Sequence, residues 1–198
     1  MGRTPTISDE QILEAAQEAF LELGMQATTS EIARRAGVSE GSIFRRFSSK
    51  ETLFLACMGL DDPEFFATVD ELSGCGELDE NLANLGHQVI DFFLKLIPKM
   101  MLLTSSGVLS RNPQAGQDAP PVRGLMKITR YFEEEMELGR IRQADSEVLA
   151  RMFIGAMHHY AFTETVGVNR LMPMPKHTYV REVVDMMLRG ASEEGSRG

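Results

Sequence analysis

Residues 28–50 read TTSEIARRAGVSEGSIFRRFSSK, and this stretch decides the fold. Its pattern predicts two short helices joined by a tight turn. Ile32 and Ala36 belong to an apolar face at helical spacing in the first helix. Gly37 follows at the position where a residue that tolerates positive φ ends a helix. Ser39 is a favourable N-cap for the next helix, because its hydroxyl can accept an otherwise unpaired backbone N–H.

The second helix of this pair has two different faces. Ile43 and Phe47 are four residues apart, so they lie on one side of a helix and are expected to face inward. The other side carries polar and cationic residues, namely Glu40, Ser42, Arg45 and Arg46. An apolar back and a hydrogen-bonding, cationic front are typical of a helix that reads the DNA major groove.

A longer pattern surrounds these features. Its positions are Ile32, Ala33, Ala36, Gly37, Val38, Ser39, Gly41, Phe44, Phe47, Lys50, Glu51 and Leu53. Together they resemble the helix-turn-helix of TetR-type (tetracycline-repressor-like) bacterial transcriptional regulators. The resemblance includes the preceding helix through Ile12, Leu13, Ala15, Ala16, Phe20 and Gly24, and so covers roughly the first 60 residues.

The chain departs from the family pattern in two places. Phe44 stands where the family usually has Tyr, whose hydroxyl commonly meets a DNA phosphate. We therefore expect Arg45 or Arg46 to supply that contact. The segment before Ile32 looks one residue shorter than the common form, which leaves open whether the helix is capped by Thr28, Thr29 or Ser30.

The resemblance implies an all-α protein of about nine helices. Residues 5–64 are expected to form a helix-turn-helix DNA-binding head whose core is three helices. Residues 65–198 are expected to form a larger helical body for effector binding and dimerisation. The residues predicted to contact DNA are Thr28, Thr29, Arg35, Ser39, Glu40, Gly41, Ser42, Phe44, Arg45, Arg46 and Lys50.

The distribution of charge supports a nucleic-acid partner although the whole chain is acidic. The net charge of the 198 residues is −9 at pH 7. Residues 28–50, however, hold five cations and two anions, which leaves a local charge of +3. Local clustering, rather than total charge, sets the electrostatic attraction to DNA.

Cysteine content and hydropathy favour a cytoplasmic protein. Cys57 and Cys75 are too few for a disulfide framework, and they are either ordinary free thiols or a redox-sensing pair. No apolar run approaches the roughly 20 residues that a membrane-spanning helix requires. The first ten residues also lack the apolar run of a signal peptide.

The longest helical pattern in the body runs from about Leu78 to Leu103. Its apolar stripe is wide enough for burial on more than one face, and Pro98 is expected to kink the helix or end it early. Such a break leaves room for an apolar ligand, although each of these residues can equally be ordinary core. The predicted effector pocket comprises Phe92, Phe93, Leu96, Met100, Met101, Phe132, Met152 and His159. The expected effector is largely apolar and uncharged, or carries one polar group near His159.

The last two long helices carry more apolar surface than one packed face requires, which suggests a subunit interface. The resembled family dimerises through its last two long helices as a four-helix bundle. The predicted interface comprises Ile154, His158, Ala161, Phe162, Val180, Val183, Val184 and Met187.

Catalytic chemistry is not indicated. The chain lacks the H-E-x-x-H, Walker, G-x-G-x-x-G and G-x-S-x-G motifs. His158 and His159 are adjacent, so on a helix they point about 100° apart and rarely serve one ion. The sequence thus predicts no enzyme, metal site or cofactor.

The leading hypothesis is a ligand-responsive transcriptional regulator. It binds near-palindromic operator DNA as a homodimer, acts as a repressor and is released by a small effector. The alternative is a constitutive DNA-binding protein whose helical body only dimerises, and a third possibility is an all-α enzyme that has acquired the head.

Overall fold

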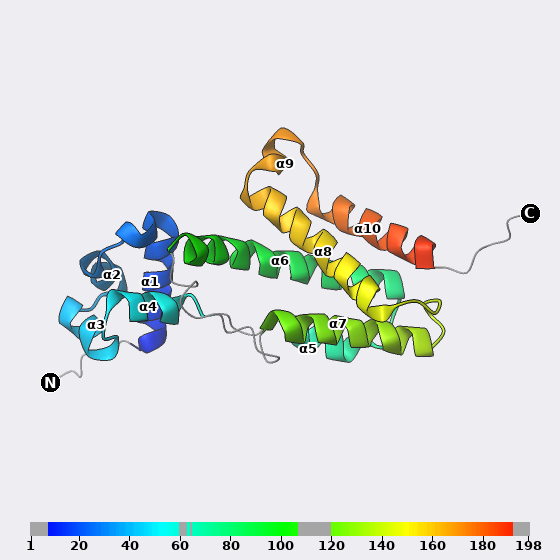
Figure 1. Cartoon of the computed structure of the whole chain (residues 1–198), viewed down its shortest axis with the longest axis horizontal. Coiled ribbons are helices and arrows are strands. Elements are labelled where there is room, and N and C mark those ends of the chain that lie inside the picture. Colours follow the sequence, from blue (N-terminus) through cyan, green and yellow to red (C-terminus); the bar gives the residue numbers. More distant parts are fainter. Residues whose placement is uncertain (1–7, 60–62, 64, 107–119, 192–198) are drawn as a thin grey trace, which may run out of the picture. The chain divides into compact units, whose positions relative to one another are not determined.

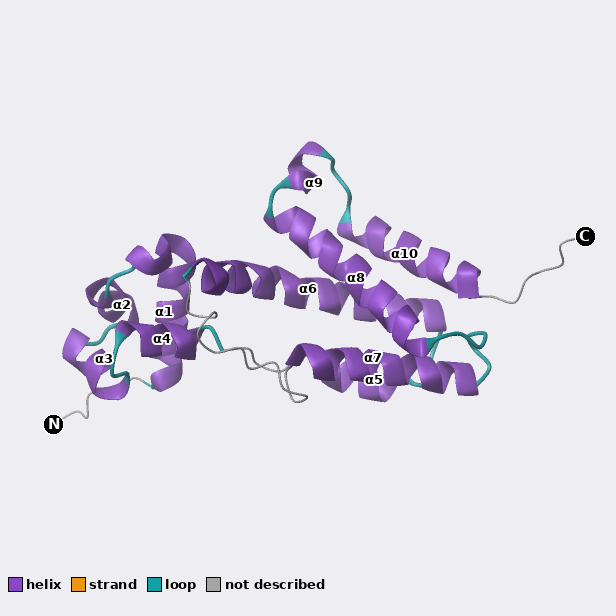
Figure 2. Cartoon of the chain, viewed as in Figure 1, coloured by secondary structure: helices purple, strands orange, loops and turns teal. Residues whose placement is uncertain are grey.

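A computed structural model describes residues 8–59, 63, 65–106 and 120–191. This part of the chain is helical throughout and contains no strand (Figure 2). It holds ten α-helices, α1–α10, and one 3₁₀ turn, so the predicted all-α class is confirmed and the expected number of helices was one too low. The described residues form two compact units.

The first unit contains four helices and the end of a fifth (Figure 1). Its elements are α1 (Asp9–Leu23), the turn η1 (Gly24–Gln26), α2 (Thr29–Ala36), α3 (Glu40–Arg46) and α4 (Lys50–Cys57). All four helices begin with a side-chain oxygen that accepts a first-turn N–H, from Ser8, Thr28, Ser39 and Ser49 respectively. The cap of α2 is thus Thr28, which resolves the three choices that the sequence left open.

The core of the first unit holds α3 by its inner face. Ile43 is buried with Ile12 and Ile32, and Phe20 packs edge-on against Phe54 at 5.0 Å between ring centroids. Burying one such side chain stabilises a fold by about 1.5–3 kcal/mol. Because the inward residues of α3 are fixed in this core, its polar face is directed to solvent.

The second unit contains the other helices. They are α5 (Phe65–Leu72), α6 (Leu78–Ser105), α7 (Pro120–Glu137), α8 (Ser146–Thr165), α9 (Val168–Leu171) and α10 (Lys176–Ala191). Asp145 caps α8, accepting the Val148 N–H at 3.0 Å. Pro120 opens α7, as the sequence predicts.

Helix α6 differs from expectation at Pro98. The helix continues through this residue to Ser105, so the predicted early end was wrong. The boundary between the two units nevertheless falls here, because residues 98–106 group with the first unit. There Leu103 is buried in the core of the head. The head predicted at residues 5–64 does not include this part of α6, and the division at 64/65 stays a prediction.

Packing in the second unit joins α6, α7, α8 and α10. A Cβ atom on Gly86 of α6 would lie 2.9 Å from Val180 Cγ1, so only glycine permits this close approach of α6 to α10. The Tyr179 hydroxyl donates to the Ala156 carbonyl at 2.9 Å and ties α10 to α8. None of the described helices combines the length and apolar content needed to cross a membrane.

The connection from α5 to α6 is held by a buried carboxylate. Glu135 of α7 is fully buried, and its Oε1 accepts the Gly74 N–H at 2.9 Å. The Arg140 guanidinium lies 3.0 Å from Glu135 Oε2 and also donates to the Gly76 carbonyl at 2.9 Å. This pairing offsets the cost of burying the charge.

Candidate functional site

The outward face of α3 presents a connected set of polar side chains. The Ser39 hydroxyl accepts the Ser42 N–H at 3.2 Å, and the two hydroxyl oxygens lie 2.8 Å apart. Arg45 Nη2 donates to Ser42 Oγ at 3.0 Å. Arg45 makes no ion pair within the part of the chain that the structure describes, so its remaining donors are available to an anionic partner.

Other cations of the head have partners within the same unit. Arg46 Nη1 lies 3.0 Å from Asp9 Oδ1, and Lys50 Nζ donates to the Met25 carbonyl at 2.6 Å. The Thr29 hydroxyl donates to the Glu40 carboxylate and so joins the start of α2 to the start of α3. Arg46 thus has a carboxylate partner, whereas Arg45 has none within the part of the chain that the structure describes.

Glu31 organises the two arginines of α2. Arg34 donates to both of its oxygens at 2.9 and 2.7 Å, and Arg35 Nε donates to Oε1 at 2.8 Å. Hydrogen bonds from Arg34, and then from Arg35, lower the pKa of Glu31 to about 2. The carboxylate thus stays charged across the physiological range and holds both guanidinium groups.

The eleven residues predicted to contact DNA all lie in the first unit, at both ends of α2, along α3 and at the start of α4. They are exposed or partly exposed. Arg35 is less accessible than Arg46, with 21% of its side chain exposed against 27%, and it has a second acid, Glu22, at 2.7 Å. Arg34 was not predicted, yet 72% of its side chain is exposed. Helical spacing could have revealed the difference, since Arg34 points away from the face that Ile32 and Ala36 bury.

The second unit contains a cavity of about 350 Å³. It is lined by residues of α5, α6, α7 and α8 and by Pro63, and it is partly open to solvent. Its lining residues are Pro63, Phe65, Phe66, Val89, Phe92, Phe93, Leu96, Pro121, Gly124, Leu125, Arg151, Ile154, Gly155 and His158. Phe92, Phe93 and Leu96 of the predicted pocket are among them.

The other residues predicted for the pocket do not line this cavity. Met100 packs in the core of the first unit, and Met101 is exposed. Phe132 is buried against Phe153, at 6.3 Å between ring centroids. Met152 is exposed on α8.

The histidine assignment also needs correction. His158, predicted for the interface, lines the cavity, whereas His159, predicted for the pocket, does not, and both residues are exposed. The two residues were exchanged because sequence shows that α8 has two apolar sides but not which side faces α6.

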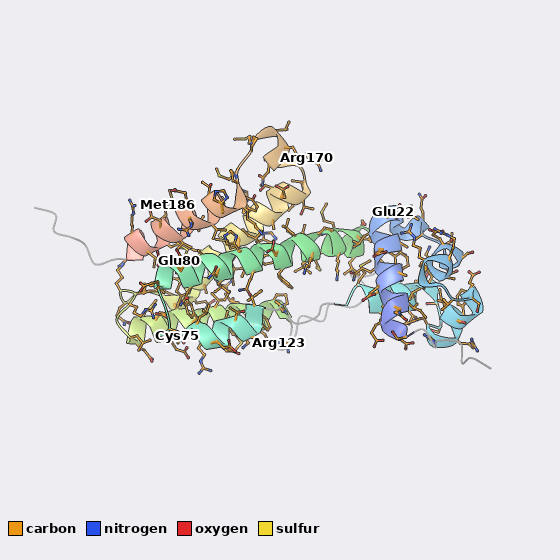
Figure 3. The ribbon with its side chains drawn as sticks, turned by 180° about the vertical axis from the view of Figure 1, so that it is seen from behind. Glu22, Cys75, Glu80, Arg123, Arg170 and Met186 are labelled. Carbon is orange, nitrogen blue, oxygen red and sulfur yellow. The ribbon has the colours of Figure 1, made fainter. Side chains whose placement is uncertain are left out.

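The predicted interface is partly wrong for the same reason. Ala161, Val180 and Val184 are buried within the second unit, where they join its core. Ile154 lines the cavity, whereas Val183 and Met187 are partly buried against the core and Phe162 remains exposed. The large apolar residues that are exposed on α8 and α10 are Val148, Met152, Phe162 and Met186, and Val166 is exposed directly after α8. Figure 3 labels Met186, whose residue surface is 70% exposed.

Comparison with known proteins identifies both parts of the chain. Residues 12–57 match the family described as "Bacterial regulatory proteins, tetR family". Residues 80–190, more than half of the chain, match "AefR-like transcriptional repressor, C-terminal domain". The chain belongs to the TetR family of bacterial transcriptional regulators. It is thus a transcriptional regulator and not an enzyme.

Individual TetR-family relatives extend over nearly the whole chain. The uncharacterized HTH-type transcriptional regulator YvkB of Bacillus subtilis is 23% identical over 194 residues, which cover 94% of this chain and 98% of YvkB. A transcriptional regulator from Rhodococcus sp. Rha1 has a TM-score of 0.66 at 18% identity, covering 93% of this chain and 97% of its own. FadR of Bacillus subtilis, solved in complex with stearoyl-CoA, has a TM-score of 0.57 at 20% identity, covering 93% and 100%. These structures show the same fold.

Among the described residues, no group of three or more His, Cys, Asp or Glu lies in a position to hold a metal ion.

Proposed function

We propose that this TetR-type regulator binds operator DNA as a homodimer and represses transcription until a small effector releases it. The observation that carries the DNA-binding part is the outward face of α3, where Ser42 and Arg45 form a hydrogen-bonded surface backed by buried Ile43. Hydroxyl and guanidinium groups on an exposed helix can reach base edges and phosphates in a major groove. Repression is supported by the repressor family that matches residues 80–190.

A homodimer supplies two such helices to one duplex. Met152 and Phe162 are exposed on α8, and Val166 is exposed directly after its last residue. They are ten and four positions apart, so at about 100° per residue they lie within about 80° of one another around the helix axis. With Met186 on α10, they offer apolar surface that a second copy can cover. Two heads related by two-fold symmetry require an operator with two inverted half-sites.

Response to a ligand is supported by the cavity in the second unit. Its volume of about 350 Å³ lies within the range of small-molecule sites in proteins. FadR, the structural relative with stearoyl-CoA, binds an apolar chain in the same fold. A constitutive DNA-binding protein has no need for such a cavity, so the cavity favours regulation over the alternative.

The test begins with DNA selected from a random pool by the purified protein. An enriched inverted repeat, bound with strong dependence on salt, is the expected result. Fragments without an inverted repeat contradict the dimeric operator model. The selected duplex then reports release in a screen of small apolar compounds, and release by none of them favours the constitutive alternative.

A further inference from the structure

Apolar side chains form most of the lining of the cavity, and polar side chains are few. Phe65, Phe66, Phe92 and Phe93 form much of it, and aliphatic residues supply most of the rest. Neighbouring rings among these four pack edge-on, with centroids 5.2 to 5.8 Å apart. Among the described lining residues, Arg151 is the one permanently charged group and no carboxylate is present. The cavity therefore combines an apolar interior with positive charge.

Arg151 retains hydrogen-bonding capacity for a ligand. Its Nε and Nη2 atoms both donate to a single oxygen, Glu147 Oε1, at 2.9 and 2.6 Å. A guanidinium carries five N–H donors, so donors remain beyond these two. The pair is weak because 62% of the Arg151 side chain and 58% of the Glu147 side chain are exposed. A ligand anion can thus share Arg151 with Glu147 or displace it.

His158 adds a second polar group on the same wall. It lies seven residues after Arg151 on α8, two helical turns along the same side. Its ring meets Phe93 edge-on at 4.9 Å and stacks on Phe162 at 6.4 Å. The α8 wall therefore has a cation at one end and, at the other, a histidine in contact with two aromatic rings.

We infer that the effector is an amphiphile with one anionic head group, held by Arg151, and an apolar body that lies among the phenylalanine rings. The inference rests on the proposed function, since it names the ligand class of the same cavity. The cavity volume of about 350 Å³ lies at the small end of the range for small-molecule sites. We therefore use a medium-chain carboxylate, decanoate, as the probe for this ligand class.

The charge of the head group distinguishes an anionic amphiphile from a cationic one and from a neutral one. Aromatic faces also attract organic cations, but Arg151 opposes a positive head group. A neutral alcohol fits the apolar interior and yet cannot form the charge-assisted hydrogen bonds that a carboxylate forms with a guanidinium. Decanoate, decanol and decyltrimethylammonium carry similar chains, so their affinities compare the three head groups.

The experiment measures binding of these three probes to the full-length protein by calorimetry. Variant Arg151→Gln removes the cation from the cavity. Arg130→Gln is the matched control, because Arg130 also forms an exposed pair with a carboxylate four residues away, Glu134 at 2.7 Å, but lies outside this cavity. Both variants should fold, since both side chains are largely exposed.

We expect the wild type to bind decanoate at least about tenfold more tightly than decanol, which corresponds to about 1.4 kcal/mol. Arg151→Gln should remove this preference and leave decanol affinity unchanged, whereas Arg130→Gln should retain it. Glu147→Gln should tighten decanoate binding, because it removes the competing carboxylate.

Three outcomes overturn the inference: equal affinity for decanoate and decanol, preference for the cation, or a preference for decanoate that survives Arg151→Gln. Failure of decanoate to bind at all also overturns it. Operator binding is measured on the same samples without any amphiphile. If the wild type does not bind the operator in the absence of amphiphile, the proposed function is contradicted instead.

Discussion

Arg45 and Arg46 are adjacent on α3 but differ in their electrostatic environment. Arg46 is paired with Asp9, whereas Arg45 is held by the Ser42 hydroxyl alone. A cation that must leave a carboxylate before it binds DNA contributes less net free energy than one that does not. The ion pairs of the free protein therefore predict that Arg45 contributes more to the free energy of DNA binding than Arg46 does.

The first prediction follows from this ranking. Arg45→Ala should weaken operator binding more than Arg46→Ala does. If Arg45 reads a guanine, its loss costs about 1–3 kcal/mol and relaxes preference at one base pair. If it contacts phosphate, affinity falls evenly across sequences and the salt slope decreases by about one. Titrations against an operator series with single base-pair changes distinguish the two cases, and Arg130→Ala on α7 is the control. A larger effect from Arg46→Ala would contradict the ranking.

The two cysteines should differ in reactivity. Cys57 is buried in the first unit, and burial raises the pKa of its thiol from 9.0 to about 12. Since the thiolate is the nucleophile, this shift slows its alkylation by on the order of a thousandfold at neutral pH. Cys75 is exposed in the connection between α5 and α6 (Figure 3).

Alkylation with iodoacetamide, followed by mass spectrometry, should therefore label Cys75 within minutes and Cys57 only after denaturation. Rapid labelling of both thiols in the native protein would show that the head opens readily. A disulfide between them under oxidising conditions would instead favour the hypothesis that the two cysteines form a redox-sensing pair.

At the scale of the element, α2 depends on the residue that ends it. Gly37 adopts φ 67° and ψ 29°, and its N–H donates to the carbonyls at the end of α2. Residues with a Cβ atom are disfavoured in this left-handed conformation by about 1–2 kcal/mol. The angle between α2 and α3, and so the presentation of the α3 face, is set by this turn.

Gly37→Ala should therefore destabilise the first unit by about 1–2 kcal/mol. Gly155→Ala is the contrasting substitution, because Gly155 lies inside α8 and a Cβ atom there meets no atom within 4 Å. It should be neutral or stabilising by up to about 1 kcal/mol. Thermal unfolding monitored by circular dichroism compares the two variants, and equal effects would rule out the left-handed turn as the cause.

At the scale of the whole molecule, assembly depends on which apolar residues remain exposed. Phe162→Asp and Met186→Asp each place a charge on the proposed subunit contact. An unpaired buried charge costs about 3–5 kcal/mol, enough to shift the dissociation constant by more than about a hundredfold. Sedimentation should show monomers that keep their helical content.

Two further variants control for the position of the charge. Met126→Asp changes an exposed methionine of α7 and should leave the dimer intact. Val184→Asp places a charge at a residue that is only 3% exposed, and should unfold the second unit rather than dissociate the dimer. Intact dimers for both Phe162→Asp and Met186→Asp would place the interface elsewhere.

Regulation couples the cavity to DNA affinity through the populations of two dimer states. Moving these populations from 1:99 to 99:1 needs about 10⁴-fold preference of the ligand for one state, or about 5.5 kcal/mol. By reciprocity, operator DNA weakens effector binding by the factor with which the effector weakens DNA binding.

Leu96→Trp should fill the cavity and abolish release while operator affinity stays within about twofold, and Leu96→Met is its volume-conserving control. Release of Leu96→Trp at the wild-type effector concentration would show that the ligand binds outside this cavity.

The sequence by itself determined the local structure of this protein. The helix start at Ser39 could be predicted because a cap depends on a few neighbouring atoms. The inner face of α3 could be predicted because Ile43 and Phe47 follow the helical period. The family of the chain followed from the same short-range pattern, since the spacing of residues in the helix-turn-helix is itself a local property.

Only the tertiary structure decided which apolar face meets which neighbour. Helical spacing shows that α8 has two apolar sides, but the partner that covers each side comes from distant parts of the chain. Thus Ala161 is buried in the core, His158 reaches the cavity and Phe162 remains exposed, although all three were predicted for one interface. Arg151 was missed as a cavity residue for the same reason, because its charge suggested solvent until α5, α6 and α7 were placed around it.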